Sequence, residues 1–178
     1  MEDAQLIRGC LDNDRKSQFE LYKKHYAFVS GICLRYLKKE PEARETTNDI
    51  FLKVFTKISL YNPAKSVFIT WLRTLAVNTC LDKMKLSSFQ FEVRSLDEDL
   101  ETATVPVEDS FTAADILDMI NQLPGQQSVI FNLFIVEGFS HEEIGALLGI
   151  SSGNSRWYLS DAKKKLRRIF SQPPYKIK

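Results

Sequence analysis

One stretch near the C-terminal end restricts most strongly how this chain can fold, because it encodes two short helical segments joined by a glycine turn. Ser140 stands just before the first segment and Glu143 follows three residues later, which is the spacing of a capping box at a helix N-terminus. Gly149 stands where this helix must end, since the residue after the last turn often needs a positive φ. Ser151 or Ser152 then begins the second helix. The pattern predicts a helix-turn-helix.

The second of these helices is amphipathic, with a basic outer face. Its predicted inward stripe recurs every three or four residues and consists of Ser155, Leu159, Ala162, Leu166 and Ile169. The opposite side carries Arg156, Trp157, Ser160, Asp161, Lys164 and Arg168. Residues 110–155 hold five acids and no lysine or arginine, whereas residues 156–178 hold eight basic residues and one acid, so positive charge begins abruptly at this helix. Such a block is typical of a phosphate-binding surface, although a plain αα-hairpin with a solvated basic helix remains the alternative.

The first half of the chain shows the spacing of a helical bundle. We expect helices near residues 3–12, 19–39, 41–58 and 65–86, the last beginning after a Tyr61-Asn62-Pro63 break. The residues predicted to face inward are Phe19, Tyr22, Tyr26, Val29, Cys33 and Tyr36 in the second helix, Ile50, Phe51, Val54, Phe55 and Ile58 in the third, and Phe68, Trp71, Leu72, Leu75 and Ala76 in the fourth.

Residues 87–109 lack a helical period and carry seven acids against the single Arg94. This composition predicts a flexible acidic linker. The expected architecture is therefore all-α, with one small helical domain over residues 1–86, a linker over 87–110, and a second domain over 111–178 that contains the helix-turn-helix. At 178 residues, two compact helical domains of this size are feasible.

Several classes of function find no support in the sequence. There is no glycine-rich phosphate loop, nucleophile elbow, paired-cysteine zinc pattern or second histidine at helical spacing from His141, so we expect no enzyme activity, cofactor or metal. Cys10, Cys33 and Cys80 are widely spaced within apolar patterns, which indicates buried free thiols in a reducing compartment. No signal peptide and no membrane span is visible, so we expect a cytoplasmic protein without direct membrane insertion.

Four stretches in order resemble the extracytoplasmic-function (ECF) sigma factors of bacterial RNA polymerase. They are the aromatic helix ending in LRYLKK, then ARETTNDIFLKVF, then VFITWLRTLAVNTCLDKMK, and finally the LP…LF…EGFSHEEIGALLGIS…AKKKL segment. The resemblance implies a promoter-specificity subunit whose partners are core RNA polymerase, promoter DNA and an anti-sigma factor, with no small-molecule substrate. The linker would then resemble the family's segment in the polymerase RNA-exit path.

The resemblance also assigns roles to residues of this chain. Polymerase binding is expected from Asn48, Asp49 and Leu52; contact with the −10 promoter element from Thr74, Asn78, Asp82 and Lys85; and contact with the −35 element from Arg156, Trp157, Ser160, Asp161, Lys163 and Lys164. Asp161 stands where the family often has arginine, so we expect it to accept from a cytosine amino group or to orient Arg156. Ser155 replaces an aliphatic residue and is expected to weaken the inward stripe.

Two other functions are weighed against this one. A freestanding helix-turn-helix regulator would use its N-terminal domain to sense a signal or to dimerise, and would bind duplex DNA tightly by itself. A sigma subunit would acquire its DNA specificity together with core polymerase. A small-molecule enzyme is the third alternative, and it lacks any nucleophile and base in a recognisable pattern.

Overall fold

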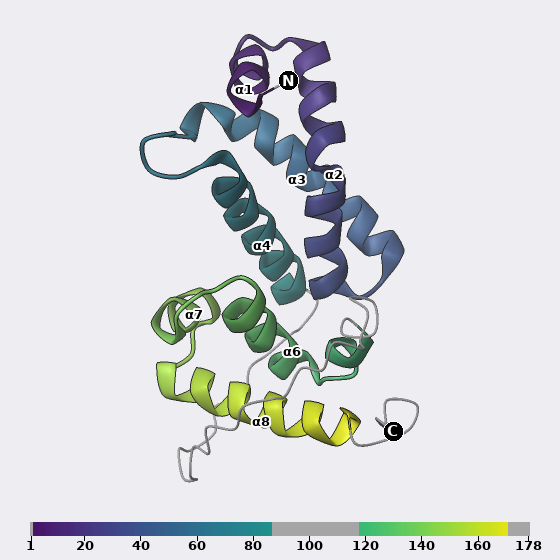
Figure 1. Ribbon diagram of the computed structural model, residues 1–178, viewed down its shortest axis with the longest axis vertical. Helices are drawn as coiled ribbons and strands as arrows, with labels where there is room; N and C mark the ends of the chain where they lie inside the picture. Colours follow the sequence, from purple (N-terminus) through teal and green to yellow (C-terminus); the bar gives the residue numbers. More distant parts are fainter. Residues whose placement is uncertain (1, 87–117, 171–178) are drawn as a thin grey trace. The chain divides into compact units, whose positions relative to one another are not determined.

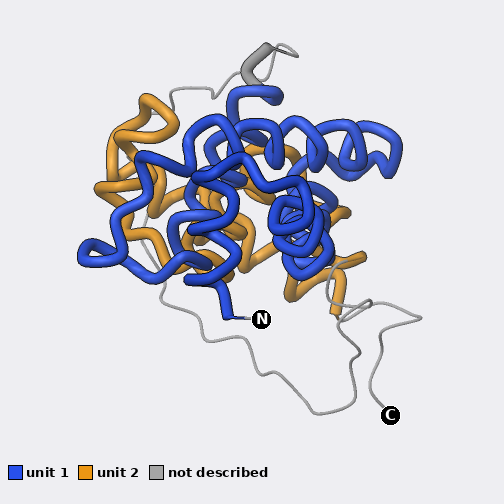
Figure 2. Tube along the Cα trace, turned by 90° about the horizontal axis from the view of Figure 1, so that it is seen from above, with its two compact units in different colours: residues 1–88 blue, residues 89–178 orange. Residues whose placement is uncertain are grey.

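The computed structural model describes residues 2–86 and 118–170, and every regular element within these ranges is helical (Figure 1). The predicted all-α class is therefore confirmed. The chain divides into two compact units, residues 1–88 and residues 89–178, which are coloured separately in Figure 2. The predicted acidic linker lies outside the described residues. None of the described helices combines the length and the apolar character that a membrane crossing requires.

Within residues 2–86, the first unit is a helical bundle built around its longest helix. It contains α1 (Asp3–Leu11), α2 (Arg15–Leu37), α3 (Glu40–Lys57), the 3-10 turn η1 (Ile58–Leu60) and α4 (Phe68–Leu86). The central helix α2 packs against α1, α3 and α4. Leu21 and Ile32 of α2, Ile50 of α3 and Leu72 of α4 are completely buried where these helices meet. Their burial supplies the main apolar driving force for the bundle.

The helix ends of this unit follow local sequence signals. Asp14 caps α2, since its carboxylate accepts hydrogen bonds from the backbone N–H groups of Lys16 (3.3 Å) and Ser17 (2.9 Å). At the other end Lys38 adopts a left-handed φ of 62° and terminates α2. Pro41 stands in the first turn of α3, as predicted.

Helix α4 begins at Phe68 and not at residue 65, where the sequence pattern predicted its start. The Asn62 side chain accepts a hydrogen bond from the backbone N–H of Ala64 at 2.9 Å, and the backbone N–H of Lys65 donates to the Asn62 carbonyl at 3.0 Å. These bonds hold a turn immediately before the helix. An asparagine side chain that closes its own local turn competes with helix formation, which explains the later start.

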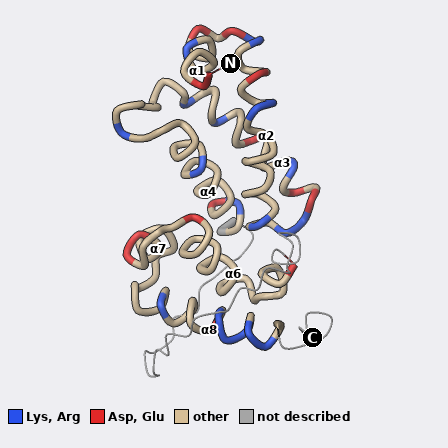
Figure 3. Tube along the Cα trace, viewed as in Figure 1, with Lys and Arg blue, Asp and Glu red and all other residues tan. Residues whose placement is uncertain are grey.

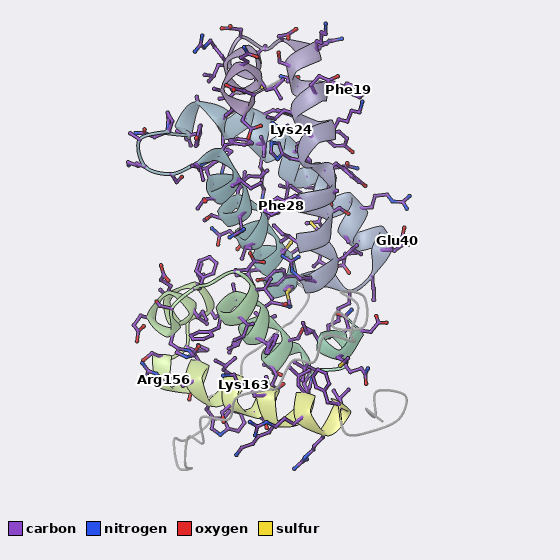
Figure 4. All side chains as sticks on the ribbon, viewed as in Figure 1. Phe19, Lys24, Phe28, Glu40, Arg156 and Lys163 are labelled. Carbon is purple, nitrogen blue, oxygen red and sulfur yellow. The ribbon has the colours of Figure 1, made fainter. Side chains whose placement is uncertain are left out.

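The prediction that Phe19 lies in the core is wrong, because 61% of this residue is exposed. Figure 4 labels Phe19 on α2. The buried side of α2 begins instead with Leu21 and His25, which lead into Val29. His25 is nearly enclosed, and its Nε2 lies 3.0 Å from a carboxylate oxygen of Asp3 on α1. Because α1 covers this end of α2, it selects a face rotated from the aromatic one. The helical period was correct and its phase was wrong at this end.

All three cysteines are free and buried within the first unit, as the sequence predicted. The Cys80 thiol of α4 donates a hydrogen bond to the Cys33 sulfur of α2, with the two sulfur atoms 3.8 Å apart. Burial raises the pKa of the Cys10 thiol to about 11, and the nearby Asp14 carboxylate acts in the same direction. These thiols serve as small apolar core groups.

The second unit is also helical over its described residues. Residues 118–121 are helical, followed by α6 (Gly125–Phe131), a π-helical turn η2 (Asn132–Val136), α7 (His141–Leu148) and α8 (Ser152–Phe170). Helix α8 packs against both α6 and α7. Its core includes Ile130, Leu133 and Ile144, all completely buried.

Candidate nucleic-acid interface

Helices α7 and α8 form the predicted helix-turn-helix, and α7 begins with a full capping box. The Ser140 hydroxyl accepts from the Glu143 backbone N–H (3.2 Å), and the Glu143 carboxylate accepts from the Ser140 backbone N–H (2.8 Å). Gly149 ends α7 with a φ of +70°. A Cβ at Gly145 would lie only 2.7 Å from the Ile150 carbonyl oxygen. The turn after α7 can therefore pass this close to the helix only with glycine at that position.

The inward stripe of α8 is confirmed. Ser155, Leu159, Ala162 and Leu166 are buried, and Ile169 is partly buried. The expectation that Ser155 weakens this stripe overlooks its partner, since the Ser155 hydroxyl lies 2.9 Å from Nδ1 of His141. The His141 ring stacks on Phe134 with ring centres 4.4 Å apart. A polar pair covered by an aromatic ring thus replaces an aliphatic contact between α7 and α8.

The outer face of α8 carries the residues that the sequence singled out for DNA. Figure 3 shows the lysines and arginines of α8 distributed along its length, and the first turn of α7 as acidic. Arg156 stands in the first part of α8 and Lys163 near its middle (Figure 4). Arg156 and Lys164 are exposed, whereas Trp157, Ser160 and Lys163 are partly buried. The helix therefore presents a guanidinium near its N-terminal end and ammonium groups further along.

The Arg156 guanidinium is held by two neighbours. Its Nη2 donates to a carboxylate oxygen of Glu142 at 3.0 Å, and its Nη1 lies 3.4 Å from the Ser152 hydroxyl. The side chains of Arg156 and Glu142 are 44% and 67% exposed, so this ion pair lies at the surface. It joins the first turn of α7 to the first turns of α8.

Asp161 contacts different groups from those expected. Its carboxylate oxygen Oδ2 accepts from the amide of Gln127 on α6 at 2.7 Å and from the Lys165 ammonium at 2.9 Å. Among the described residues, the acid that contacts Arg156 is Glu142. The expectation that Asp161 orients Arg156 therefore finds no support in the geometry. The expectation that it reads cytosine remains a proposal, and both hydrogen bonds compete with it.

His141 is partly buried next to this surface, and the charged groups there shift its pKa. Burial holds the pKa of His141 below its ordinary value of 6.5, and the Arg156 charge acts in the same direction, while the Glu142 carboxylate opposes them. The neutral imidazole is thereby favoured beside the Ser155 hydroxyl.

The residues expected to bind polymerase lie on the outer side of α3. Leu52 is 64% exposed and Asn48 is exposed, whereas Asp49 is partly buried. The Tyr22 hydroxyl donates to the Asn48 side-chain oxygen at 3.3 Å. An exposed leucine beside an amide and a carboxylate makes a small apolar spot with a polar rim, which suits a protein partner.

The residues expected at the −10 element lie along α4. Thr74 and Asp82 are exposed and Asn78 is partly buried. Lys85 belongs to the same helix, but its side chain lies outside the described part of the structure. At the start of the helix, the rings of Trp71, Phe68 and Tyr61 form a cluster with centres 5.5–5.7 Å apart. This cluster anchors the segment that precedes the polar stripe.

Sequence reasoning missed Glu142 and Gln127 as parts of this interface. Both are separated from their partners in the chain, and only the packed α6, α7 and α8 bring them together. The sequence offered one indication that Arg156 has an acidic partner. Arg156 is the first basic residue after a long stretch that contains acids and no lysine or arginine. Over the described residues, no group of three His, Cys, Asp or Glu side chains is arranged to hold a metal ion.

Two family models match this chain in the same order as its units. The model described as "Sigma-70 region 2" matches residues 21–88, and the one described as "Sigma-70, region 4" matches residues 113–166. The RNA polymerase sigma factor CarQ of Myxococcus xanthus is 30% identical over 155 residues, covering 86% of this chain and 88% of CarQ. The ECF sigma factor SigE of Mycolicibacterium smegmatis is 29% identical, and the match spans 83% of this chain but only 59% of SigE.

Two solved structures share the fold. One is the sigma factor RpoE in complex with the anti-sigma factor NepR from Bartonella quintana, with a TM-score of 0.53 and 17% identity over 86% of this chain and 96% of that one. The other is CnrH in complex with the cytosolic domain of CnrY, with a TM-score of 0.52 and 15% identity over 95% of this chain and 97% of that one. At these identities the likeness concerns the fold alone.

Proposed function

The chain belongs to the sigma-70 family, as an ECF RNA polymerase sigma factor, and on that premise we propose how its two units divide the work. The first unit binds core polymerase through α3 and the −10 element through α4. The second unit reads the −35 element through α8. The polar outer face of α8, opposite a buried stripe, is the observation that carries the assignment of DNA reading.

Physical chemistry supports each contact. An arginine fork matches the two acceptors of a guanine edge, which gives about 1–3 kcal/mol of discrimination against other bases. Lys163 and Lys164 supply phosphate contacts that fix the position of the helix without reading sequence. Along α4, the polar side chains Thr74, Asn78 and Asp82 offer partners for bases that leave the stack when the strands open.

The proposal includes partners and a place of action. We expect this sigma factor to act in the cytoplasm with core polymerase and to carry out no catalytic step of its own. An anti-sigma factor is proposed as its inhibitor, since the sigma factor RpoE was solved in complex with the anti-sigma factor NepR. The freestanding regulator is disfavoured because the first unit matches the sigma-70 region 2 family.

The decisive experiment mixes the purified full chain with sigma-free bacterial core polymerase and separates free from bound protein by size-exclusion chromatography. We expect a stable complex that selects promoter sequences from a randomised duplex library, while the chain alone binds duplex DNA weakly. If no complex forms and the chain alone binds one operator with nanomolar affinity, it acts as a freestanding regulator and the proposal is wrong.

A further inference from the structure

The pair formed by Arg156 and Glu142 joins the two helices of the helix-turn-helix at the point expected to meet DNA. Glu142 is the second residue of α7, and Arg156 is the fifth residue of α8. Their contact of 3.0 Å spans the turn between the helices. Ser152 adds a weaker contact at 3.4 Å. Glu142 has no role in the capping box, which uses its neighbour Glu143.

An ion pair this exposed contributes little to the stability of the fold. Its effect on the guanidinium is more specific. Without the carboxylate, the long arginine side chain could place its charge on any nearby phosphate, which favours every DNA sequence equally. With the carboxylate, one N–H of Nη2 is engaged and the charge is partly neutralised. A guanidinium carries five N–H donors, so others remain available for a base edge.

From this geometry we infer that Glu142 is a positioning residue for promoter recognition: it holds the Arg156 guanidinium for base readout and away from phosphates. This inference rests on the proposed function of α8. The carboxylate contacts no base itself. It restricts the directions in which the remaining N–H donors of Arg156 can point, so that the guanidinium contacts a base edge and not an arbitrary phosphate.

The test compares full-length variants bound to core polymerase, each selecting from the same library of duplexes with a randomised −35 region. Glu142→Gln is expected to reduce the base preference at one position about threefold to tenfold, within the range that a bidentate arginine contact provides. Arg156→Ala should abolish the preference at that same position. The double variant should match Arg156→Ala, because Glu142 acts only through the arginine.

Salt dependence supplies a second measurement that a purely structural role would not change. In Glu142→Gln, the released guanidinium should pair with a phosphate, so the slope of log affinity against log salt for a random duplex should steepen by up to about 0.9. The matched control is Glu143→Gln, which removes the same charge from the same helical turn while glutamine retains the capping-box hydrogen bond. This control should leave the base preference unchanged.

The possible outcomes distinguish a failure of the proposed function from a failure of the role inferred for Glu142. If the wild-type complex selects no −35 sequence, the proposed function and this inference both fail. If it selects a sequence and Glu142→Gln keeps the full preference, only the inference fails. It also fails if Glu142→Gln alters the preference equally in the Arg156→Ala background, because the carboxylate would then act directly on DNA.

Discussion

At the scale of single residues, two basic side chains of α8 form ion pairs with acidic side chains. Arg156 is paired with Glu142, and Lys165 with Asp161. Acidic side chains beside a DNA-binding helix lower its affinity for all sequences, because they repel phosphates. The two pairs hold different groups in place. One involves the arginine expected to read a base, and the other anchors the middle of α8 to Gln127 of α6.

Asp161→Asn should change the electrostatic attraction of α8 to DNA of any sequence without changing which bases the helix prefers. Asparagine keeps an oxygen that can accept from Gln127, while the loss of charge frees Lys165. We expect binding to random duplexes to tighten about twofold to fivefold at low salt, with an unchanged −35 preference. Fluorescence anisotropy of the polymerase complex measures the affinity for random duplexes, and library selection measures the −35 preference.

A lost preference for cytosine at one position would instead show that Asp161 reads a base. Lys165→Gln serves as the comparison, because it removes the paired cation and leaves the carboxylate in place. It should weaken binding to all sequences by a similar factor.

The low pKa of His141 predicts a dependence of stability on pH. Its folded pKa lies below 6.5, so as the pH falls through about 6.5 the unfolded chain takes up the proton first. The free energy of unfolding should therefore fall between about pH 7.5 and about pH 5.5. In His141→Gln this decrease should be smaller, as measured by urea denaturation followed through tryptophan fluorescence. Equal decreases in both proteins would contradict the assignment.

At the scale of elements, the sequence predicted what local signals determine. The capping box at Ser140, the turn at Gly149 and the inward stripe of α8 follow from short-range chemistry, and the structure confirms them. The exposure of Phe19 could not be predicted, because the phase of the buried face of α2 depends on where α1 packs. The partner of Arg156 was missed for the same reason. Helix packing, and not spacing in the chain, selects it.

Two glycines in helices should respond oppositely to replacement by alanine. Gly145→Ala would place a methyl group 2.7 Å from a backbone oxygen in the helix-turn-helix, and should destabilise the chain by about 1–3 kcal/mol. Gly31→Ala in α2 meets only a side-chain nitrogen of Arg35 at 3.9 Å, and should stabilise by up to about 1 kcal/mol. Thermal unfolding followed by circular dichroism compares them. A neutral Gly145→Ala would argue against the close approach at the turn.

At the scale of the whole molecule, the two units offer separable contacts. Asp49 and Leu52 lie on α3 of the first unit, and Arg156 lies on α8 of the second. Docking on polymerase and reading of the −35 element are therefore expected to fail independently when each surface is changed. Effects of two substitutions usually add when the two residues share no contacting residue.

Asp49→Lys should weaken binding to core polymerase at least tenfold, on the order of 1.4 kcal/mol or more, because it reverses a charge on α3, the helix proposed to bind polymerase. Arg156→Ala should leave that affinity unchanged and reduce transcription from the selected promoter. Glu45→Lys on the same helix would remove the ion pair with Lys83 and serves to detect effects on folding. If Arg156→Ala weakens binding to core polymerase as much as it weakens transcription, the division of labour is contradicted.

The enclosed sulfur atoms of the first unit have a practical consequence. Alkylation of a thiol needs both access and a thiolate, and the three native cysteines lack access. A single cysteine introduced at an exposed position, such as Ser59 or Ala146, should therefore be the site that reacts with maleimide dyes under native conditions. Fluorophores can be attached to either unit without first replacing any native residue, and energy transfer between them can follow the protein as it meets polymerase and promoter.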